Sequence, residues 1–332
     1  MTLKWAVMGT GFISNNAISG IAQSEASQLH SVYGRKAGLV SDFQARHDIP
    51  YGFTDLDAAL SDDAVDAVYV GLPNHVHHEV TIKAAEAGLA VLSEKSLTTT
   101  MADAEALLDA VSTSGTFFVE GLMYLAHPFL ARFVDVLNDG RLGALRAVNG
   151  YYCADIWRLV NPLGMGTLYN LGCYPVSLLQ LTVQTMCGSA AFTQRQMQGF
   201  GSLGSDNTIV DAACSVRFDN GVLATLQSTD SFGMSNAFSV LGDNGVLNFV
   251  TNPWLPVAGR NTMCWSPYDG EPELIHVDDP HDAFYHQTKL VEHHVALGHR
   301  EAARPSPRHR DSWEIMEFLT GWEASCRSAS SN

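Results

Sequence analysis

A glycine-rich segment follows the first apolar run of the chain. Trp5 to Met8 leads directly into Gly9-Thr10-Gly11-Phe12-Ile13-Ser14, and a stretch with helical spacing comes next. The first glycine permits a tight turn, and the second lets the backbone approach a phosphate at the positive end of a helix dipole. A structural glycine turn is the alternative, but a strand before and a helix after favour a pyrophosphate site. The residues predicted to bind a dinucleotide here are Gly9, Thr10, Gly11, Phe12 and Ile13.

The end of the second apolar run bears on the choice between the two nicotinamide dinucleotides. An NAD site usually offers a carboxylate to the adenosine ribose at this point, whereas this chain reads Val32-Tyr33-Gly34-Arg35-Lys36. Arginine makes paired contacts to a phosphate, and lysine adds a second charge. We therefore predict that Arg35 and Lys36 bind the 2′-phosphate of NADP in preference to NAD. The alternative is that both cations begin a solvated helix.

Two further segments with polar and ionisable residues follow later apolar runs. The first is Gly71-Leu72-Pro73-Asn74-His75-Val76-His77, and the second is Leu92-Ser93-Glu94-Lys95-Ser96-Leu97. The histidines at 75, 77 and 78 raise the question of a metal ion. In a helix His75 and His78 are three residues apart, His77 points elsewhere, and no acidic or thiol ligand accompanies them. We predict no metal site.

Predicted strands and helices alternate through the first part of the chain, and they must position these segments. Short apolar runs suited to strands are separated by amphipathic stretches suited to helices, a pattern that predicts a parallel sheet covered on both faces. The pattern fades after about Glu120. The fold class is therefore α/β, and we expect residues 1–122 to form a dinucleotide-binding Rossmann domain.

Longer β-like runs dominate the second part of the chain. Asp219-Asn220-Gly221 and Asp243-Asn244-Gly245 predict hairpin turns, because Asn-Gly tolerates positive φ. A helix is expected at Pro128 to Leu137. Residues 123–332 are predicted to form an α+β domain that carries a large open antiparallel sheet, binds the substrate and makes the oligomer contacts. Two late helices end it, and the last of them is a candidate to pack back on the first domain. They are expected at Ala283 to Leu297 and Arg308 to Cys326.

The amino-acid composition disfavours some classes of binding partner. The 332 residues are 46% hydrophobic and 16% charged, and the formal net charge of −16 disfavours nucleic acid and anionic lipid. No uninterrupted apolar run is long enough to span a membrane, and the N-terminus lacks the features of a signal peptide. Six cysteines contain no CxxC pair. These features predict a cytoplasmic protein with reduced thiols and no membrane partner.

Taken in order, the motifs resemble those of the Gfo/Idh/MocA oxidoreductase family. The Pro73-Asn74 segment resembles its PNxxH loop, and Glu94-Lys95-Ser96 resembles its EKP motif. The likeness continues through Glu120-Gly121-Leu122-Met123-Tyr124 and reaches Gly172-Cys173-Tyr174-Pro175. In motifs it is strongest to the branch of glucose-fructose oxidoreductase, xylose dehydrogenase and dihydrodiol dehydrogenase.

Two residues depart from the family pattern. Ser96 stands where the motif has proline, which bears on how rigidly Lys95 is presented. Asn170 stands where many members carry aspartate, so a carboxylate that would orient a hydroxyl group is missing. An amide can donate and accept hydrogen bonds, but it cannot act as a base.

The resemblance implies roles for individual residues. Lys95 and Tyr174 would form the catalytic proton-transfer pair, with the lysine charge lowering the pKa of the phenol. Glu94 and Glu120 would support the cofactor loop and the nicotinamide side, and Arg158 would contact substrate unless it makes a structural salt bridge. The implied cofactor-binding residues are Leu72, Pro73, Asn74, His77, Glu94, Lys95 and Glu120. The implied substrate-binding residues are Lys95, Tyr124, Arg158, Asn170 and Tyr174.

The resemblance implies an NAD(P)-dependent oxidoreductase that transfers a hydride to or from a carbon of a sugar or related polyol. It leaves two alternatives open. One is a redox-assisted glycosidase with tightly held NAD, and the other is a non-enzymatic sensor that binds the cofactor. Keeping both Lys95 and Tyr174 disfavours the sensor. Relatives pair through the open sheet, so a homodimer or homotetramer is also implied.

Overall fold

The computed structural model describes residues 2–329, and they group into two compact units. The first comprises the chain up to Ala126 together with Asp282–Trp313, and the second comprises His127–His281 together with the chain from Glu314 on. That two separate domains meet between residues 122 and 123 stays a prediction. Among the described residues, no helix combines the length and apolar character that crossing a membrane requires.

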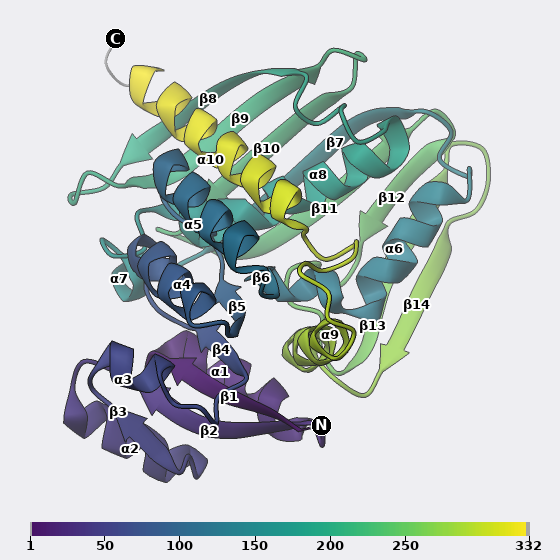
Figure 1. The fold of residues 1–332 in the computed structure, drawn as a ribbon. Helices are drawn as coiled ribbons and strands as arrows, with labels where there is room; N and C mark the ends of the chain where they lie inside the picture. Colours follow the sequence, from purple (N-terminus) through teal and green to yellow (C-terminus); the bar gives the residue numbers. More distant parts are fainter. Residues whose placement is uncertain (1, 330–332) are drawn as a thin grey trace. The chain divides into compact units, whose positions relative to one another are not determined.

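A six-stranded parallel sheet forms the centre of the first unit (Figure 1). Its strands lie in the order β3-β2-β1-β4-β5-β6, so successive strands run outward from β1 to one edge and then from β4 to the other. The sequence alternation predicts this Rossmann arrangement, and the structure confirms it. The strands are β1 (Leu3–Met8), β2 (Ser27–Tyr33), β3 (Tyr51–Phe53), β4 (Ala67–Val70), β5 (Ala90–Glu94) and β6 (Phe118–Gly121).

Helices cover this sheet and bury its apolar side chains. Trp5, Tyr69 and Leu92 from three strands are buried in the core of the unit. Helix α9 returns from late in the sequence to pack on α1, and Gly20 permits the contact, since a Cβ there would lie 2.4 Å from the Phe284 carbonyl oxygen. The helical segments are α1 (Phe12–Gln23), α2 (Ala37–His47), α3 (Leu56–Leu60), η1 (Asn74–Val76), α4 (His77–Glu86), α5 (Met101–Ser114), η2 (Met123–Ala126) and α9 (Ala283–Ala296).

The second unit contains an eight-stranded sheet in the order β14-β13-β12-β11-β7-β10-β9-β8. Its neighbouring strands are antiparallel except for the parallel pair β7 and β10. Both expected hairpins are confirmed, because β9 pairs with β10 and β11 with β12 across the two Asn-Gly turns. The strands are β7 (Leu145–Ala154), β8 (Arg195–Leu203), β9 (Ile209–Phe218), β10 (Leu223–Thr229), β11 (Met234–Gly242), β12 (Gly245–Phe249), β13 (Gly259–Pro267) and β14 (Glu273–Asp279).

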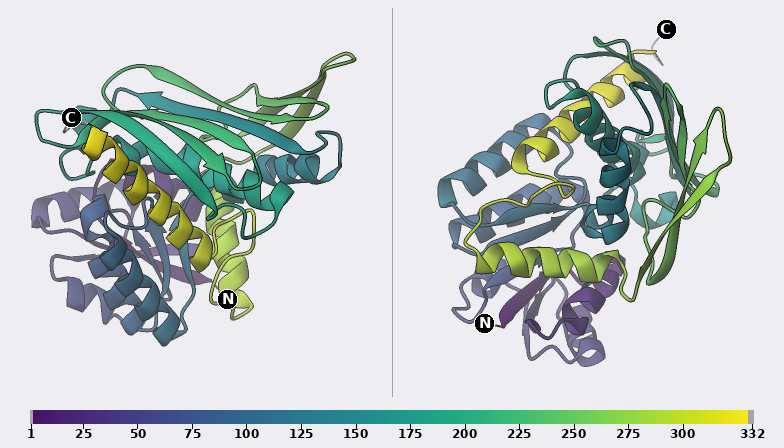
Figure 2. Two further views of the ribbon diagram at one scale, coloured as in Figure 1. Left: turned by 90° about the horizontal axis from the view of Figure 1, so that it is seen from above. Right: turned by 90° about the vertical axis from the view of Figure 1, so that its right-hand side faces the viewer.

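Helices of the second unit lie on one face of the large sheet. Helices α6 (Pro128–Asn138) and α8 (Cys173–Cys187) lie against that face, and no described helix of this unit lies on the other (Figure 2). A short helix, α7 (Trp157–Val160), and a π-helical turn, η3 (Leu168–Gly172), precede α8. Helix α10 (His309–Ala329) begins in the first unit and ends in the second. The large sheet therefore has one face packed in the core and one face left open.

Candidate functional site

The carboxyl ends of the six parallel strands lie at one edge of the sheet in the first unit. Strand order reverses between β1 and β4, and ligands of open α/β sheets bind outside the carboxyl ends at such a point. Gly9 follows β1, Gly71 follows β4, and Lys95 follows β5. The parallel sheet thus brings together, along a single edge, three segments that the sequence analysis predicts to be functional.

Gly9 makes the turn from β1 possible. Its φ is +114°, a value that L side chains rarely adopt, and a Cβ at this position would lie 2.5 Å from the Gly71 carbonyl oxygen. The Gly9 N–H donates a 2.9 Å hydrogen bond to the Tyr33 carbonyl oxygen of β2. Glycine is therefore required by both conformation and space.

Gly11 caps helix α1 with open space in front of it. No side chain caps the helix, its first turn holds no acidic residue, and a Cβ on Gly11 would meet nothing within 4 Å. Uncapped N–H groups at a helix N-terminus bind anions. Ser14, at the third small position of the motif, is buried and donates a 3.4 Å hydrogen bond to the Gly71 carbonyl oxygen. The site thus fits a pyrophosphate, and Ser14 gives the turn internal support.

Arg35 and Lys36 lie in the segment after β2 and are exposed. Neither cation has a salt-bridge partner within residues 2–329. Gly34 lets Thr10 approach, because a Cβ on Gly34 would lie 3.2 Å from the Thr10 Cγ2 atom. The two cations consequently stand beside the glycine turn with their charges available to an anion.

His77 joins two of the loops at the sheet edge. The side chain is fully buried, with Nε2 2.7 Å from the Leu72 carbonyl oxygen and Nδ1 2.8 Å from the Ser96 carbonyl oxygen. Burial lowers its pKa to about 4. His77 therefore ties the segment after β4 to the residue next to Lys95. Near it, Leu72 and Pro73 are half-buried and Asn74 is buried.

Lys95 is half-buried directly after β5, and Glu94 before it is buried. The Tyr69 hydroxyl donates to Glu94 Oε1 at 2.8 Å, and the Lys95 N–H lies 3.3 Å from Oε2. Burial raises the pKa of Glu94, although the Lys95 charge lowers it in part. The peptide bond between Lys95 and Ser96 is cis. Glu94 thus holds the backbone that presents Lys95.

Glu120 is a second buried carboxyl group of this edge. It lies on β6, and its Oε1 accepts a 2.8 Å hydrogen bond from the Leu97 N–H. Burial raises its pKa to about 7, and the nearby Lys95 charge counteracts this only in part. Glu120 therefore supports the backbone just beyond Lys95 and titrates near neutral pH.

This titration predicts a pH dependence of stability. A pKa that is raised on folding means that the folded state disfavours the ionised form of the carboxyl group. The free energy of unfolding therefore falls as pH rises from about 4.5 towards about 7. We expect Glu120→Gln to remove up to about 3 kcal/mol of this penalty. The variant should melt above the wild type at pH 8 and close to it at pH 5. Thermal melts across pH check this, with exposed Glu105→Gln as the control. Equal pH profiles for all three proteins would contradict it.

Tyr174 lies at the start of α8 in the second unit and is buried. Its ring packs edge-on against Tyr152, with centroids 5.4 Å apart, and lies 6.2 Å from the Trp254 ring. Burial raises the pKa of Tyr152 to about 12, so this neighbour stays protonated. Two aromatic rings thus lie beside the phenol of Tyr174, the residue that the resemblance implies for proton transfer.

Asn170 lies one turn before Tyr174 and belongs to a hydrogen-bonded cluster. Its Nδ2 donates to Asp230 Oδ2 at 2.8 Å and to Asn161 Oδ1 at 3.1 Å. Of the other residues implied for substrate, Arg158 on α7 is exposed and Tyr124 in η2 is buried. Sequence reasoning missed Asp230 and Asn161, since neither belongs to a motif and only the strand β10 hints at the burial of Asp230.

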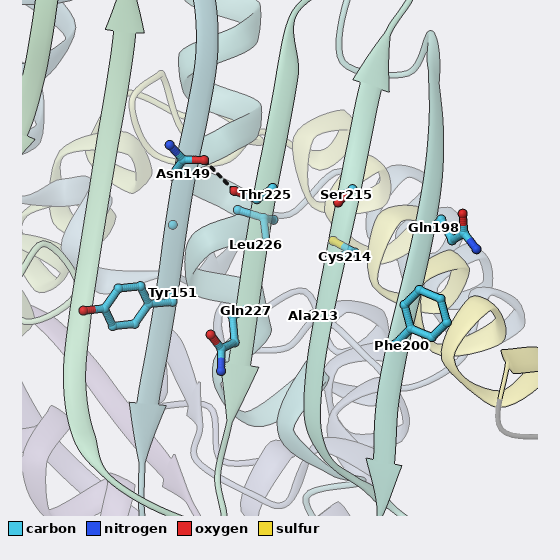
Figure 3. A pocket seen from close by; sticks show the side chains of 11 residues that line it. Asn149, Tyr151, Gln198, Phe200, Ala213, Cys214, Ser215, Thr225, Leu226 and Gln227 are labelled. Carbon is cyan, nitrogen blue, oxygen red and sulfur yellow. Dashed lines mark hydrogen bonds between the residues drawn. The ribbon is translucent and has the colours of Figure 1, made fainter.

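The open face of the large sheet carries a shallow hollow of about 340 Å³. Its lining residues come from β7, β10, β9 and β8, and Figure 3 shows their side chains, with the Thr225 hydroxyl bonded to Asn149. The lining residues include no charged side chain. They are Asn149, Gly150, Tyr151, Gln198, Phe200, Ala213, Cys214, Ser215, Thr225, Leu226 and Gln227.

Both units match models of one protein family. Residues 3–121 match the model described as an oxidoreductase family with an NAD-binding Rossmann fold, and residues 131–248 match its GFO/IDH/MocA C-terminal domain. Together the two models span most of the chain.

Individual relatives and solved structures resemble the chain over different lengths. An NADP-dependent D-xylose 1-dehydrogenase of Haloferax volcanii is 29% identical over 55% of this chain and 58% of its own length. An uncharacterized oxidoreductase of Rhizobium meliloti is 30% identical over 54% and 55%. The chain thus matches little more than half the length of these relatives. A 3-ketoreductase of Actinomadura kijaniata, solved with NADP and TDP-benzene, shares the fold with a TM-score of 0.86, 22% identity and 98% coverage of both chains.

Proposed function

The chain belongs to the GFO/IDH/MocA oxidoreductase family, and we propose that it is an NADP-dependent oxidoreductase acting on one carbon of a sugar or related polyol. One observation carries the proposal. The glycine turn, the open N-terminus of α1 and Lys95 lie at the same carboxyl edge of the parallel sheet, where its strand order reverses. A dinucleotide bound along that edge would have the Lys95 cation beside it.

The cofactor would be held by the backbone at Gly9 to Ile13 and by the loop Leu72 to Asn74. His77 is buried, so its contribution would pass through the Leu72 and Ser96 carbonyl groups that it contacts. Glu94 and Glu120 would act in the same indirect way, by holding the backbone on either side of Lys95. When bound, the nicotinamide supplies or accepts the hydride of the reaction.

The preference for NADP is assigned to Arg35 and Lys36. Both cations are exposed and lack a salt-bridge partner among the residues that the structure describes, which suits them to a 2′-phosphate. We expect Arg35→Ala to lower kcat/KM for NADP about 10- to 100-fold, since charge-assisted hydrogen bonds are lost, and to leave NAD almost unaffected. Initial rates with each cofactor check this, with Arg132→Ala, a partly exposed arginine of α6, as the control. An equal loss with both cofactors would count against the assignment.

Proton transfer is assigned to Lys95 and Tyr174. The reacting oxygen must gain or lose a proton as the carbon changes oxidation state, and a phenol with a nearby cation can exchange it near neutral pH. Lys95 would bind the reacting oxygen, and Tyr174 would carry the proton. Arg158, Tyr124 and Asn170 are proposed to contact the substrate. The support for these roles is the family membership together with the place of Lys95 at the sheet edge.

The substrate class is proposed from the relatives. Besides the xylose dehydrogenase, they include an NADP-dependent scyllo-inositol 2-dehydrogenase of Bacillus subtilis and a 1,5-anhydro-D-fructose reductase of Ensifer adhaerens. The test is a panel of D-xylose, scyllo-inositol, 1,5-anhydro-D-fructose and trans-1,2-dihydrobenzene-1,2-diol, offered with the oxidised and the reduced cofactor. Turnover of at least one compound with NADP is expected. Absence of turnover with either cofactor would reject the proposal.

A cytoplasmic location stays a prediction.

We also propose that the open sheet face pairs two copies of the chain. The hollow on it is uncharged in a chain of net charge −16, and Phe200 is 60% exposed there. Ala213→Arg would place a buried charge in such an interface, so we expect it to halve the sedimenting mass, from two chains to one or from four chains to two. Ala106→Arg on α5 serves as the control. A wild type that sediments as a single chain would contradict the pairing.

A further inference from the structure

Two histidines at the C-terminal end of α9 bring their ring nitrogens together. The Nδ1 atoms of His294 and His299 lie 2.8 Å apart. The His294 side chain is buried, whereas His299 is exposed. Both residues belong to the first unit. One ring is thus held by the protein, and its partner can be reached from solvent.

The turn that ends α9 positions the two rings. The His299 N–H donates to the His294 carbonyl oxygen at 3.0 Å, and the Gly298 N–H donates to the Val295 carbonyl oxygen at 3.0 Å. These two bonds form a Schellman motif, and Gly298 supplies its positive φ of +67°. The motif brings the side chains at the positions of His294 and His299 together, where apolar contacts are usual. In a continuous helix, residues five apart would lie on different faces, so sequence spacing does not reveal this pair.

The plane of the His294 ring is fixed by packing. The ring stacks on Phe117 with the centroids 5.7 Å apart and an angle of 9° between the planes. Phe117 belongs to the buried core of the unit, directly before β6. Burial and the charges of His293 and His299 lower the pKa of His294. The ring is therefore neutral near neutral pH, which is the form that binds a metal ion.

We propose that His294 and His299 form a two-nitrogen site for a divalent transition-metal ion, and that the ion is Cu(II). With metal–nitrogen distances of about 2.0–2.1 Å, neighbouring nitrogens lie about 2.9 Å apart at a right angle and about 3.3 Å apart in a tetrahedron. The observed 2.8 Å fits the right angle, which square-planar or tetragonal Cu(II) and Ni(II) adopt. Of the common divalent ions, Cu(II) also binds nitrogen ligands most tightly.

Without an ion, a proton joins the two rings. One ring then carries its hydrogen on Nδ1 and donates it to Nδ1 of the other ring. Binding of the ion requires this hydrogen to sit on Nε2 instead, so that both Nδ1 lone pairs face the metal. Within residues 2–329, no third histidine, cysteine or carboxylate completes the group, so water would fill the other positions. The net charge of −16 favours the approach of a cation.

The variant His299→Phe tests the inference. Phenylalanine keeps a ring at the exposed position of the turn, so the fold should be retained, but it offers no ligand atom. Equilibrium dialysis against Cu(II) should find one more ion bound per chain in the wild type than in His299→Phe. Removing one nitrogen of a chelating pair should weaken binding about 100-fold or more, so His294→Leu should lose the same single ion. The double variant should lose no more than either single variant.

His293→Ala is the matched control. His293 is exposed on the same helix next to His294, but its ring nitrogens do not belong to the pair, so this variant should bind as many ions as the wild type. Subtracting the EPR spectrum of Cu(II)-loaded His299→Phe from that of the wild type should leave a tetragonal signal coupled to two imidazole nitrogens. Thermal melts without metal establish that each variant is folded, and His299→Phe decides alone if His294→Leu is not.

Three results would overturn the inference. The first is an equal number of Cu(II) ions bound by the wild type and His299→Phe. The second is a loss of the same ion in His293→Ala. The third is a difference spectrum without imidazole coupling. None of these measurements depends on turnover, so the inference stands or falls separately from the proposed function.

Discussion

Replacing Lys95 with methionine is expected to lower kcat/KM about 10³-fold. Methionine keeps the length and much of the apolar stem of lysine but removes the charge and the hydrogen-bond donor that would bind the reacting oxygen. Groups that act in proton transfer typically contribute 10²- to 10⁴-fold to the rate. Lys95 is half-buried directly after β5, and its charge lowers the pKa of buried Glu94 and Glu120, so the replacement should lower the melting temperature but leave the protein folded. Steady-state kinetics with the substrate identified from the panel, together with thermal melts, check both parts.

Lys83→Met is the matched control for this variant. Lys83 lies on α4 of the same unit, where its side chain pairs with Asp57 at 2.6 Å near the surface. An exposed ion pair contributes little to stability, and this one has no proposed part in the reaction. The control should retain wild-type rates. A Lys95→Met enzyme that keeps more than about a tenth of the wild-type kcat/KM would contradict the assignment of proton transfer to Lys95.

The second large effect is expected from alanine substitutions at the two glycines of the turn. One should lower stability, and the other should lower cofactor affinity. Gly9→Ala would place a Cβ 2.5 Å from the Gly71 carbonyl oxygen at a φ of +114°. We expect a loss of about 3 kcal/mol of stability, because backbone strain and overpacking each cost about 1–3 kcal/mol. The turn must also shift, so cofactor affinity should fall as well. Thermal melts and calorimetric titration with NADP measure the two effects separately.

Gly11→Ala should instead leave the fold intact. Gly11 has a φ of −81°, and nothing lies within 4 Å of a Cβ placed there. An alanine at a compatible position tends to stabilise by about 0.4–1 kcal/mol. The added methyl group would, however, stand where a pyrophosphate must approach, so we expect about a tenfold or greater loss of NADP affinity. Unchanged NADP affinity in Gly11→Ala would mean that the dinucleotide does not bind at this turn.

Local patterns in the sequence predict much of the first unit. Strand and helix periodicity identify its parallel sheet, and the positive φ of Gly9 accounts for the first glycine after Met8. The segments ending at His77 and Lys95 follow strands whose carboxyl ends share an edge, so their proximity follows from the parallel topology. The side-chain contacts do not follow in the same way. Nothing in the spacing predicts that both ring nitrogens of His77 lie against carbonyl oxygens.

The second unit is harder to predict for two physical reasons. Helix α8 is missed because residues from Cys173 to Gln184 are all buried, and a helix surrounded by protein has no polar face to reveal its period. Asp230 is missed because its partner Asn170 lies 60 residues away in sequence, and only tertiary packing brings them together. The sequence pattern does not indicate strands β8, β13 and β14 either. The return of residues 282–313 to the first unit likewise depends on contacts between distant segments.

The central claim is that the chain carries out net oxidation or reduction of a sugar or polyol with NADP. The most direct measurement mixes the protein with excess NADP and an excess of the most active panel compound. It then counts the moles of NADPH formed against the moles of carbonyl product. The account predicts a ratio of one to one that continues through many turnovers. A bound cofactor that never accumulates in reduced form, with or without cleavage of a glycosidic bond, would contradict it and favour the glycosidase or the sensor.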